Sequence, residues 1–174
     1  MCTGLAKHYV QVASLFAAIA GTLNPIYNYK DEDITKLAEE YNAIVTDATD
    51  DDVIELMTNK NIVAMFQGRA ENGPRALGNR SLMFDPTFED GKDFVNEIKH
   101  REYFRPFAGS ILAEDAHEWF DLRGMEDSPH MMYAVNCQPG IEEKIPAIIL
   151  VDGTCRIQTV TREQNKHYYD LIKA

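Results

Sequence analysis

Glycines and arginines gather in one stretch of the chain, residues 67–81, which follows a continuous apolar run. The stretch reads QGRAENGPRALGNRS and matches neither the Walker spacing nor GxGxxG. Glycine lets backbone N–H groups approach an anion closely, and the planar donors of arginine match phosphate and carboxylate oxygens. Residues 67–81 therefore suggest an oxyanion-binding loop, although surface arginines paired with Glu71 and Asp85 fit the same composition equally well.

Two more basic residues flank a junction between a helix and a strand. Residues 89–101 carry apolar side chains one turn apart, which predicts a helix with Lys99 beside its apolar stripe, near the C-terminal end. Arg105 precedes a proline, which stops a helix and favours an extended backbone before the strand expected at 107–112. Lys99 and Arg105 are therefore expected close to one another.

A third cation lies on an alternating segment near the C-terminus. Residues 154–160 alternate as a strand does, so Arg156 and Gln158 share one face and Cys155 and Ile157 share the other. Arg156 is therefore the natural third member of an anion site.

The elements that position these residues alternate between helix and strand. Apolar spacing, capping residues and branched runs predict helices at 5–23, 31–41, 49–60, 89–101, 113–120 and 162–172, and strands at 62–66, 107–112, 131–137, 145–151 and 154–160. A tight hairpin turn is expected at Asp152-Gly153. This order predicts an α/β fold, with a mixed, mostly open twisted sheet covered by helices.

Length and charge limit the classes of function. With 174 residues, of which 45% are hydrophobic, the chain can bury one good core, so one domain is expected. A net charge of −11 repels a phosphate backbone, so nucleic acid is not expected as a partner. Residues 67–105 are the least acidic part, which favours a local site for a small anion.

The cysteines and histidines indicate neither a disulfide framework nor a metal site. The three cysteines have no CxxC spacing and the five histidines no HExxH spacing, so we expect a cytoplasmic protein with no metal bound by this chain. Lys7 and His8 interrupt the apolar residues 5–23, so neither a signal peptide nor a transmembrane helix is expected there. This helix either belongs to the core or packs against a partner chain or a second copy.

Four strings add a resemblance that spacing alone does not reveal: FQGRAENGPRALGNRSLMFDP, REYFRPFAGSIL, SPHMMYAV and IPAIILVDGTCRIQTVTRE. In this order they closely resemble the C-terminal domain of the O-carbamoyltransferase family, which includes nodulation and antibiotic-biosynthesis enzymes. The resemblance covers residues 24–174 and implies a YrdC-like α/β domain. Residues 1–23 look like at most the final helix of an upstream actin-like (Kae1-like) domain.

The family resemblance also implies a function. In that family the C-terminal domain forms carbamoyl-adenylate from ATP and carbamoyl phosphate, with Mg²⁺ arriving on the nucleotide. A separate N-terminal domain carries a metal and moves the carbamoyl group to a hydroxyl acceptor. This chain is therefore expected to be the activating half of a carbamoyltransferase, with the transfer domain either supplied by a partner chain or lost.

Site residues follow from the matched motifs. Lys99, Arg105 and Arg156 match positions expected to hold phosphate or carbamoyl oxygens, and we give them the charge-neutralising part of catalysis. Candidate nucleotide contacts come from the glycine-rich stretch and the adjoining strands: Arg69, Gly73, Arg75, Gly78, Asn79, Ser110 and Gln158. No protein nucleophile is required, because a carbamate oxygen that attacks the α-phosphate already carries charge.

Three residues depart from the family pattern. Asn72 stands where the loop usually has an aromatic residue, Gly109 where RPFAP has proline, and Leu150 where a histidine commonly precedes VDG. Such losses affect turnover more than binding, so the alternative is a catalytically inactive module that binds nucleotide or carbamoyl groups. A YrdC-like protein acting on tRNA ranks last, because the acidic chain lacks a basic surface and a KRxxxKP-like signature.

Overall fold

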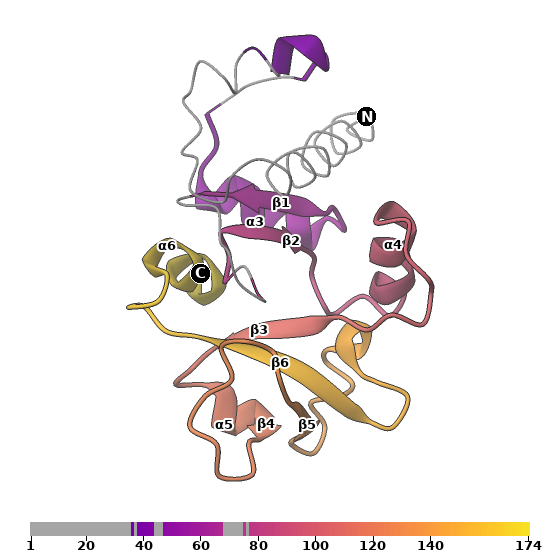
Figure 1. Cartoon of the computed structure of the whole chain (residues 1–174), viewed down its shortest axis with the longest axis vertical. Coiled ribbons are helices and arrows are strands. Elements are labelled where there is room, and N and C mark those ends of the chain that lie inside the picture. Colours follow the sequence, from indigo (N-terminus) through magenta and orange to yellow (C-terminus); the bar gives the residue numbers. More distant parts are fainter. Residues whose placement is uncertain (1–35, 37, 44–46, 68–74, 76) are drawn as a thin grey trace. The chain divides into compact units, whose positions relative to one another are not determined.

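The chain divides between Met83 and Phe84 into two units, which are described separately. The computed structural model describes residues 36, 38–43, 47–67, 75 and 77–174 (Figure 1). The helix expected at 5–23, the boundary expected after residue 23 and most of the helix expected at 31–41 lie outside these residues. Of the helix expected at 31–41, the described residues 36 and 38–40 are helical.

Helix α3 (Asp50–Thr58) of the first unit lies where the sequence predicts a helix. Its N-terminus is a capping box, in which the Thr49 hydroxyl accepts the Asp52 N–H at 3.3 Å and the Asp52 carboxylate accepts the Thr49 N–H at 2.7 Å. At the other end Lys60 adopts a left-handed backbone with φ of 61°, and its N–H donates to the Met57 carbonyl oxygen at 3.0 Å. Local capping chemistry thus sets both ends of this helix.

Strand β1 (Val63–Phe66) pairs antiparallel with strand β2 (Arg80–Met83) in the same unit. The strand expected at 62–66 is confirmed. The loop expected at 67–81 is wrong at its end, because Arg80 and Ser81 belong to β2. Four residues that start with arginine and serine carry little strand signal alone, and pairing with β1 decides their conformation.

The second unit is built on a sheet with the strand order β3-β6-β5-β4 (Figure 1). These strands are β3 (Ala108–Leu112), β4 (Phe120–Asp121), β5 (Ala134–Cys137) and β6 (Thr154–Val160). Strand β3 runs parallel to β6, whereas β5 is antiparallel to both β6 and β4. The expected α/β fold class with a mixed, open sheet is confirmed.

One face of this sheet forms the hydrophobic core. The buried cluster joins sheet residues to helix α5 (Ala116–Trp119) and nearby loops. Its members are Ala116, Phe120, Leu122, Val135, Ile141, Ile145, Ile148, Cys155 and Ile157. Because Cys155 and Ile157 belong to the core, alternation along β6 puts Arg156 and Gln158 on the opposite face, as the sequence predicts.

The strand expected at 145–151 is wrong. Pro146–Ile148 form a 3-10 helix, η1, followed by one β-bridge from Ile149 to Cys155. Proline has no N–H for a ladder and suits the first turn of a helix. The N–H of Ala147, the next residue, donates to the Pro86 carbonyl oxygen at 3.2 Å, which ties η1 to the chain before helix α4.

Helices α4 (Gly91–Ile98) and α6 (Lys166–Lys173) are shorter than the helices expected at 89–101 and 162–172. The start of α6 is delayed because Thr161 and Gln164 accept each other's backbone N–H groups with their side chains, at 2.9 and 3.3 Å. These local bonds compete with helix hydrogen bonds. Asn165 then caps the helix.

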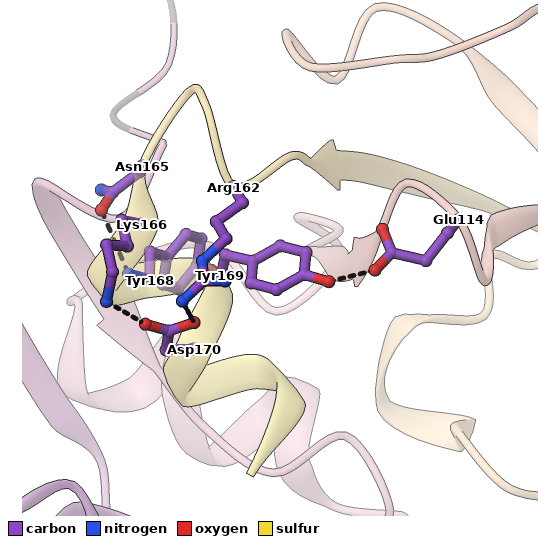
Figure 2. A network of polar contacts seen from close by, with 7 residues as sticks. All are labelled: Glu114, Arg162, Asn165, Lys166, Tyr168, Tyr169 and Asp170. Atoms are coloured by element: carbon purple, nitrogen blue, oxygen red, sulfur yellow. Dashed lines mark hydrogen bonds and ion pairs between the residues drawn. The ribbon is translucent and has the colours of Figure 1, made fainter.

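Polar contacts tie helix α6 to the rest of its unit (Figure 2). The Tyr169 hydroxyl donates to the Glu114 carboxylate, which lowers the pKa of Glu114. Asp170 pairs with Lys166 at 2.6 Å and with Arg162 at 3.4 Å. Helix α6 also packs on strand β3, so it covers part of the sheet face opposite the core.

Candidate functional site

The segment between α4 and β3, residues 99–107, is called the α4–β3 loop, and its start is set by a Schellman motif. Lys99 is the C-cap, and His100 follows in a left-handed conformation with φ of 50°. The N–H of His100 donates to the Glu97 carbonyl oxygen at 3.1 Å, and the N–H of Arg101 donates to the Asn96 carbonyl oxygen at 2.9 Å. These bonds fix the direction in which Lys99 and Arg101 leave the helix.

Asn96 anchors the far side of the same loop. Its side chain is 1% exposed, and its amide nitrogen donates to the carbonyl oxygens of Tyr103 at 3.4 Å and Arg105 at 2.9 Å. Its buried Oδ1 accepts no hydrogen bond from the residues that the structure describes. One buried amide thus holds two loop carbonyls at the end of α4.

Arg105 lies at the surface and pairs with a carboxylate of its own loop. Its Nε lies 2.6 Å from Glu102 Oε2, and the two side chains are 49% and 56% exposed. The hydrogen bond from Arg105 is the largest cause that lowers the pKa of Glu102. Because a guanidinium has five donors, this contact leaves others for a ligand.

Lys99 lies in a partly dehydrated, positively charged setting. Loss of water around its ammonium group lowers its pKa, and the charge of Arg101 lowers it further. The residue as a whole is exposed. The exposure of Lys99 and the lowered pKa agree, because exposure averages the entire residue whereas the pKa depends on the surroundings of the ammonium group alone.

Arg156 lies on the central strand β6 between two small residues. Ala108 of β3 and Ala134 of β5 are its register partners on either side. Paired residues of neighbouring strands point to the same face, so the Arg156 side chain lies between the methyl groups of Ala108 and Ala134 across the sheet. Its guanidinium Nε is buried.

Arg105 and Arg156 lie at the same end of the sheet. Arg105 precedes Ala108 by three residues, and Ala108 pairs with Arg156. Three extended residues and one strand spacing place the two Cα atoms within roughly 15 Å of each other. Two arginine side chains can therefore reach one ligand of nucleotide size from these positions.

Ser110 and Gln158 lie one row further along the same face and bond to each other. The Ser110 hydroxyl donates to Gln158 Oε1 at 3.3 Å, and the Tyr168 hydroxyl of α6 donates to Ser110 Oγ at 2.6 Å. Gln158 Nε2 donates to the Pro129 carbonyl oxygen at 2.9 Å. Gln158 is 2% exposed, and burial raises the pKa of Tyr168. The structure brings Ser110 and Gln158 together in a buried chain of hydrogen bonds.

The glycine-rich stretch belongs to the first unit, and Arg69, Gly73 and Asn72 lie outside the described residues. Arg75 and Asn79 are both half-buried. Gly78 is buried with φ of 84°, and its carbonyl oxygen accepts the Gln67 amide at 3.3 Å. The Gln67 N–H also donates to the Asn79 carbonyl oxygen at 2.9 Å. These contacts close the C-terminal end of the stretch onto β1, and the role of its residues stays a prediction.

The other two departures from the family pattern lie in the second unit. Gly109 faces Ile148, and a Cβ at Gly109 would lie 2.6 Å from Ile148 Cδ1. Ile148 therefore occupies the space that a larger residue at 109 would need. Leu150 donates its N–H to the Thr154 carbonyl oxygen at 2.7 Å across the expected hairpin turn, in which Gly153 has φ of 79°.

The described residues lack two features, a group of metal ligands and a membrane-spanning helix. Among these residues, no group of three or more histidine, cysteine, aspartate or glutamate side chains is arranged to hold a metal ion. Within the same part of the chain, no helix is long and apolar enough to cross a membrane.

Sequence reasoning missed two residues that shape the second unit, Asn96 and Tyr168. Asparagine is a poor residue for a helix interior, and its place next to Val95 on the buried side of α4 was an available signal. Tyr168 gave no comparable signal, because tyrosine in an apolar helix stripe is typical of ordinary packing. Its hydroxyl partner lies 58 residues away.

Comparisons with known proteins agree with the four strings. Residues 54–174 match the family described as Carbamoyltransferase C-terminus. The nodulation protein NolO of Bradyrhizobium diazoefficiens is 46% identical over 120 residues, which cover 68% of this chain and 22% of NolO. The nodulation protein NolNO of Sinorhizobium fredii is 44% identical over 115 residues, covering 65% and 17% of the two chains. An uncharacterized protein of Methanocaldococcus jannaschii is 38% identical over 120 residues, covering 68% and 19%.

The second unit is a mixed α/β domain whose α4–β3 loop carries the cations Lys99, Arg101 and Arg105. The family match extends over more than half of the chain and includes the whole second unit. The chain belongs to the carbamoyltransferase C-terminus family, as its strings predict. It spans about a fifth of the length of the relatives it matches.

Proposed function

We propose that this chain is the carbamoyl-activating half of an O-carbamoyltransferase, which forms carbamoyl-adenylate from ATP and carbamoyl phosphate. The α4–β3 loop carries the proposal, because it presents Lys99, Arg101 and Arg105 on one well-anchored segment beside the strand pair that bears Arg156. Membership of the carbamoyltransferase family supports this reading over other anionic substrates.

The proposed reaction needs neutralised charge and positioning more than proton transfer. Water first releases phosphate from carbamoyl phosphate and leaves carbamate. A carbamate oxygen then attacks the α-phosphorus of ATP, the bond from that phosphorus to the bridging oxygen breaks, and pyrophosphate leaves with the electron pair. Donors aimed at the phosphate oxygens lower the barrier, and Mg²⁺ bound to the nucleotide shares the charge.

Each cation has a role that follows from its chemistry. Arg105 and Arg156 supply planar forks that bind two oxygens of one phosphate or carbamoyl group. Lys99 supplies a point charge for the leaving pyrophosphate, and its lowered pKa reflects a dehydrated ammonium that an anion would stabilise. Binding of an anion would also draw Arg105 from Glu102, an exposed pair that is weak by itself.

Transfer to a hydroxyl acceptor belongs, in this proposal, to a separate domain or partner chain. The chain spans about a fifth of the length of the relatives named above, so the rest of their length is available for a transfer activity. The purified chain should therefore carry out activation at most. Carbamoylation of a hydroxyl acceptor by this chain alone would contradict the division.

The test combines binding and partial-reaction measurements on the full chain. Isothermal titration should detect Mg-ATP, and Arg105→Ala should weaken binding about ten- to hundredfold, since a hydrogen bond to a charged group contributes about 1.5–3 kcal/mol. Arg123→Ala is the matched control, because Arg123 is an exposed arginine beyond β4, at the opposite edge of the sheet from β3. Equal affinity of Arg105→Ala and the unmodified chain would remove Arg105 from the site.

Exchange of labelled pyrophosphate into ATP separates the proposed enzyme from the inactive alternative. The proposal predicts exchange that requires carbamoyl phosphate and falls in Arg105→Ala but not in Arg123→Ala. ATP binding without any exchange would instead favour a binding or regulatory module that has kept the fold.

A further inference from the structure

Two aromatic side chains stand out on the α4–β3 loop. Tyr103 is 77% exposed and Phe104 is 65% exposed, which makes them the most exposed large aromatic side chains among the described residues. Their rings meet edge to face, with centroids 5.8 Å apart and planes at 83°. Each ring thus keeps a face toward solvent, which is an unfavourable arrangement for an apolar group unless something binds there.

The loop that carries these rings is anchored at several points. The Schellman motif holds its start, and the buried Asn96 amide holds the carbonyl oxygens of Tyr103 and Arg105. The Arg105 N–H also donates to the Glu102 carbonyl oxygen at 3.1 Å. The rings are therefore displayed by an ordered backbone, so a ligand that stacks on them loses little binding energy to ordering the loop.

The charge around the rings is opposite to that of the chain. Residues 99–105 carry Lys99, Arg101 and Arg105 against the single carboxylate of Glu102, a net charge of +2 in a chain of net charge −11. Glu102 is itself paired with Arg105. A ligand that suits both features must be planar and apolar at one end and anionic at the other. Nucleotides have this combination, because every base has a face that stacks and every phosphate accepts charged hydrogen bonds.

We propose that Tyr103 and Phe104 form the base-stacking surface for the nucleotide of this site, with Lys99 and Arg101 placed toward its phosphates. This inference rests on the proposed function and adds where the base binds. A protein partner fits less well, because specific protein interfaces bury about 800 Å² on each side, which two rings do not supply. Stacking on aromatic faces is tolerant of the base, so the surface should accept purines without strong preference between them.

The experiment compares a nucleotide with the same phosphate chain lacking a base. Isothermal titration of the full chain with Mg-ATP and with Mg-tripolyphosphate is repeated for Tyr103→Ala and Phe104→Ala. Each variant should raise the Kd for ATP about tenfold and leave the Kd for tripolyphosphate unchanged. Tyr103→Phe keeps the ring and should bind ATP as the unmodified chain does. Tyr133→Ala is the control for an exposed aromatic outside the loop, since Tyr133 is 55% exposed but belongs to the segment before β5 and not to the α4–β3 loop.

Three outcomes would overturn the stacking surface. Unchanged ATP affinity in both alanine variants would remove the rings from the site while leaving the proposed function intact. Equal weakening of ATP and tripolyphosphate would mean that the rings only support the loop. Weakening by Tyr133→Ala to the same degree would mean that any exposed aromatic has this effect. No ATP binding by the unmodified chain would instead overturn the proposed function itself, and the base site with it.

Discussion

Two neighbouring regions on one face of the sheet differ in how their polar side chains are bonded. At the end where β3 and β6 begin, the α4–β3 loop exposes Arg105 and two aromatic rings, and its ion pair between Arg105 and Glu102 lies at the surface. One row further along, Ser110, Gln158 and Tyr168 bond to each other under helix α6, and Gln158 is 2% exposed. The donors of the first region are exposed to water, whereas those of the second region are buried and already hydrogen-bonded to other groups of the chain.

This difference predicts that the exposed loop and the buried row contribute differently to ligand binding and to the stability of the fold. A buried polar group that has its partners costs free energy when they are removed, whereas an exposed pair contributes little to folding. Ser110 and Gln158 stay predicted nucleotide contacts, but any such contact competes with the hydrogen bonds that they already make. Variants in the buried row should therefore act first on stability, and variants in the loop should act first on binding.

The largest effect is expected for Gln158→Leu. Leucine has a similar size but leaves the Pro129 carbonyl oxygen and the Ser110 hydroxyl without this partner. The free energy of unfolding should fall by about 1–3 kcal/mol, measured by urea denaturation at neutral pH.

Gln138→Leu is the matched control for this variant. Gln138 makes the same kind of contact, from its amide to the His117 carbonyl oxygen at 3.3 Å, but at an exposed site. Its free energy of unfolding should change by less than about 0.5 kcal/mol. If the free energy of unfolding fell equally in the two variants, burial around Gln158 would not explain the loss of stability in Gln158→Leu.

A smaller loss is expected for Tyr168→Phe, which removes one hydroxyl from the same row. The ring stays in place, while Ser110 loses the donor that lies 2.6 Å away. One internal hydrogen bond contributes about 1 kcal/mol, so the urea midpoint should shift down at constant slope. A change in the slope would mean that helix α6 detaches from β3, rather than losing a single bond.

The sequence predicts those parts of the fold that local chemistry determines. Helix α3 lies within the helix expected at 49–60, with Thr49 as its N-cap, and the bounds of β6 (Thr154–Val160) agree at both ends. Strand β2 was missed because its ladder joins residues that lie on either side of the long glycine-rich stretch. Residues 145–151 were misassigned because Pro146 outweighs the branched residues around it, which alone favour a strand.

The candidate site shows the same division between local and distant determinants. Lys99 and Arg105 were placed at a helix-to-strand junction from the helix stripe and from Pro106, both of which are local signals. The anchoring of that junction by Asn96 and the bond from Tyr168 to Ser110 depend on the folded chain. Residue types and order therefore predict a set of anion-binding side chains, but not which of them are held by internal bonds.

Helix α6 offers a pH test of the exposed contacts. The hydrogen bond from Lys166 is the main cause that lowers the pKa of Asp170, and Arg162 lowers it further. A carboxyl with a lowered folded pKa stabilises the fold above its unfolded pKa of about 4, and that contribution is lost as the pH falls through the folded value. Asp170→Asn should therefore lower the melting temperature at pH 6 and have almost no effect near pH 2. A gap of the same size at both pH values would mean that Asp170 acts through packing and not through charge.

The smallest effect on stability is expected where the largest effect on binding is proposed, at Arg105. Its pair with Glu102 lies at the surface, three residues apart in the chain, with 49% and 56% of the side chains exposed. Such pairs gain little in water because the charges are screened and two long side chains must be held in place. Arg105→Ala and Glu102→Gln should each move the melting temperature by less than about 2 °C, as measured by differential scanning calorimetry.

The effects of Arg105→Ala and Glu102→Gln on ATP affinity should nevertheless differ in sign, because the first variant removes a phosphate donor whereas the second releases Arg105 from its competing carboxylate. Glu102→Gln is thus expected to tighten ATP binding, and a melting temperature that drops by several degrees in either variant would show that the loop depends on this pair for its structure.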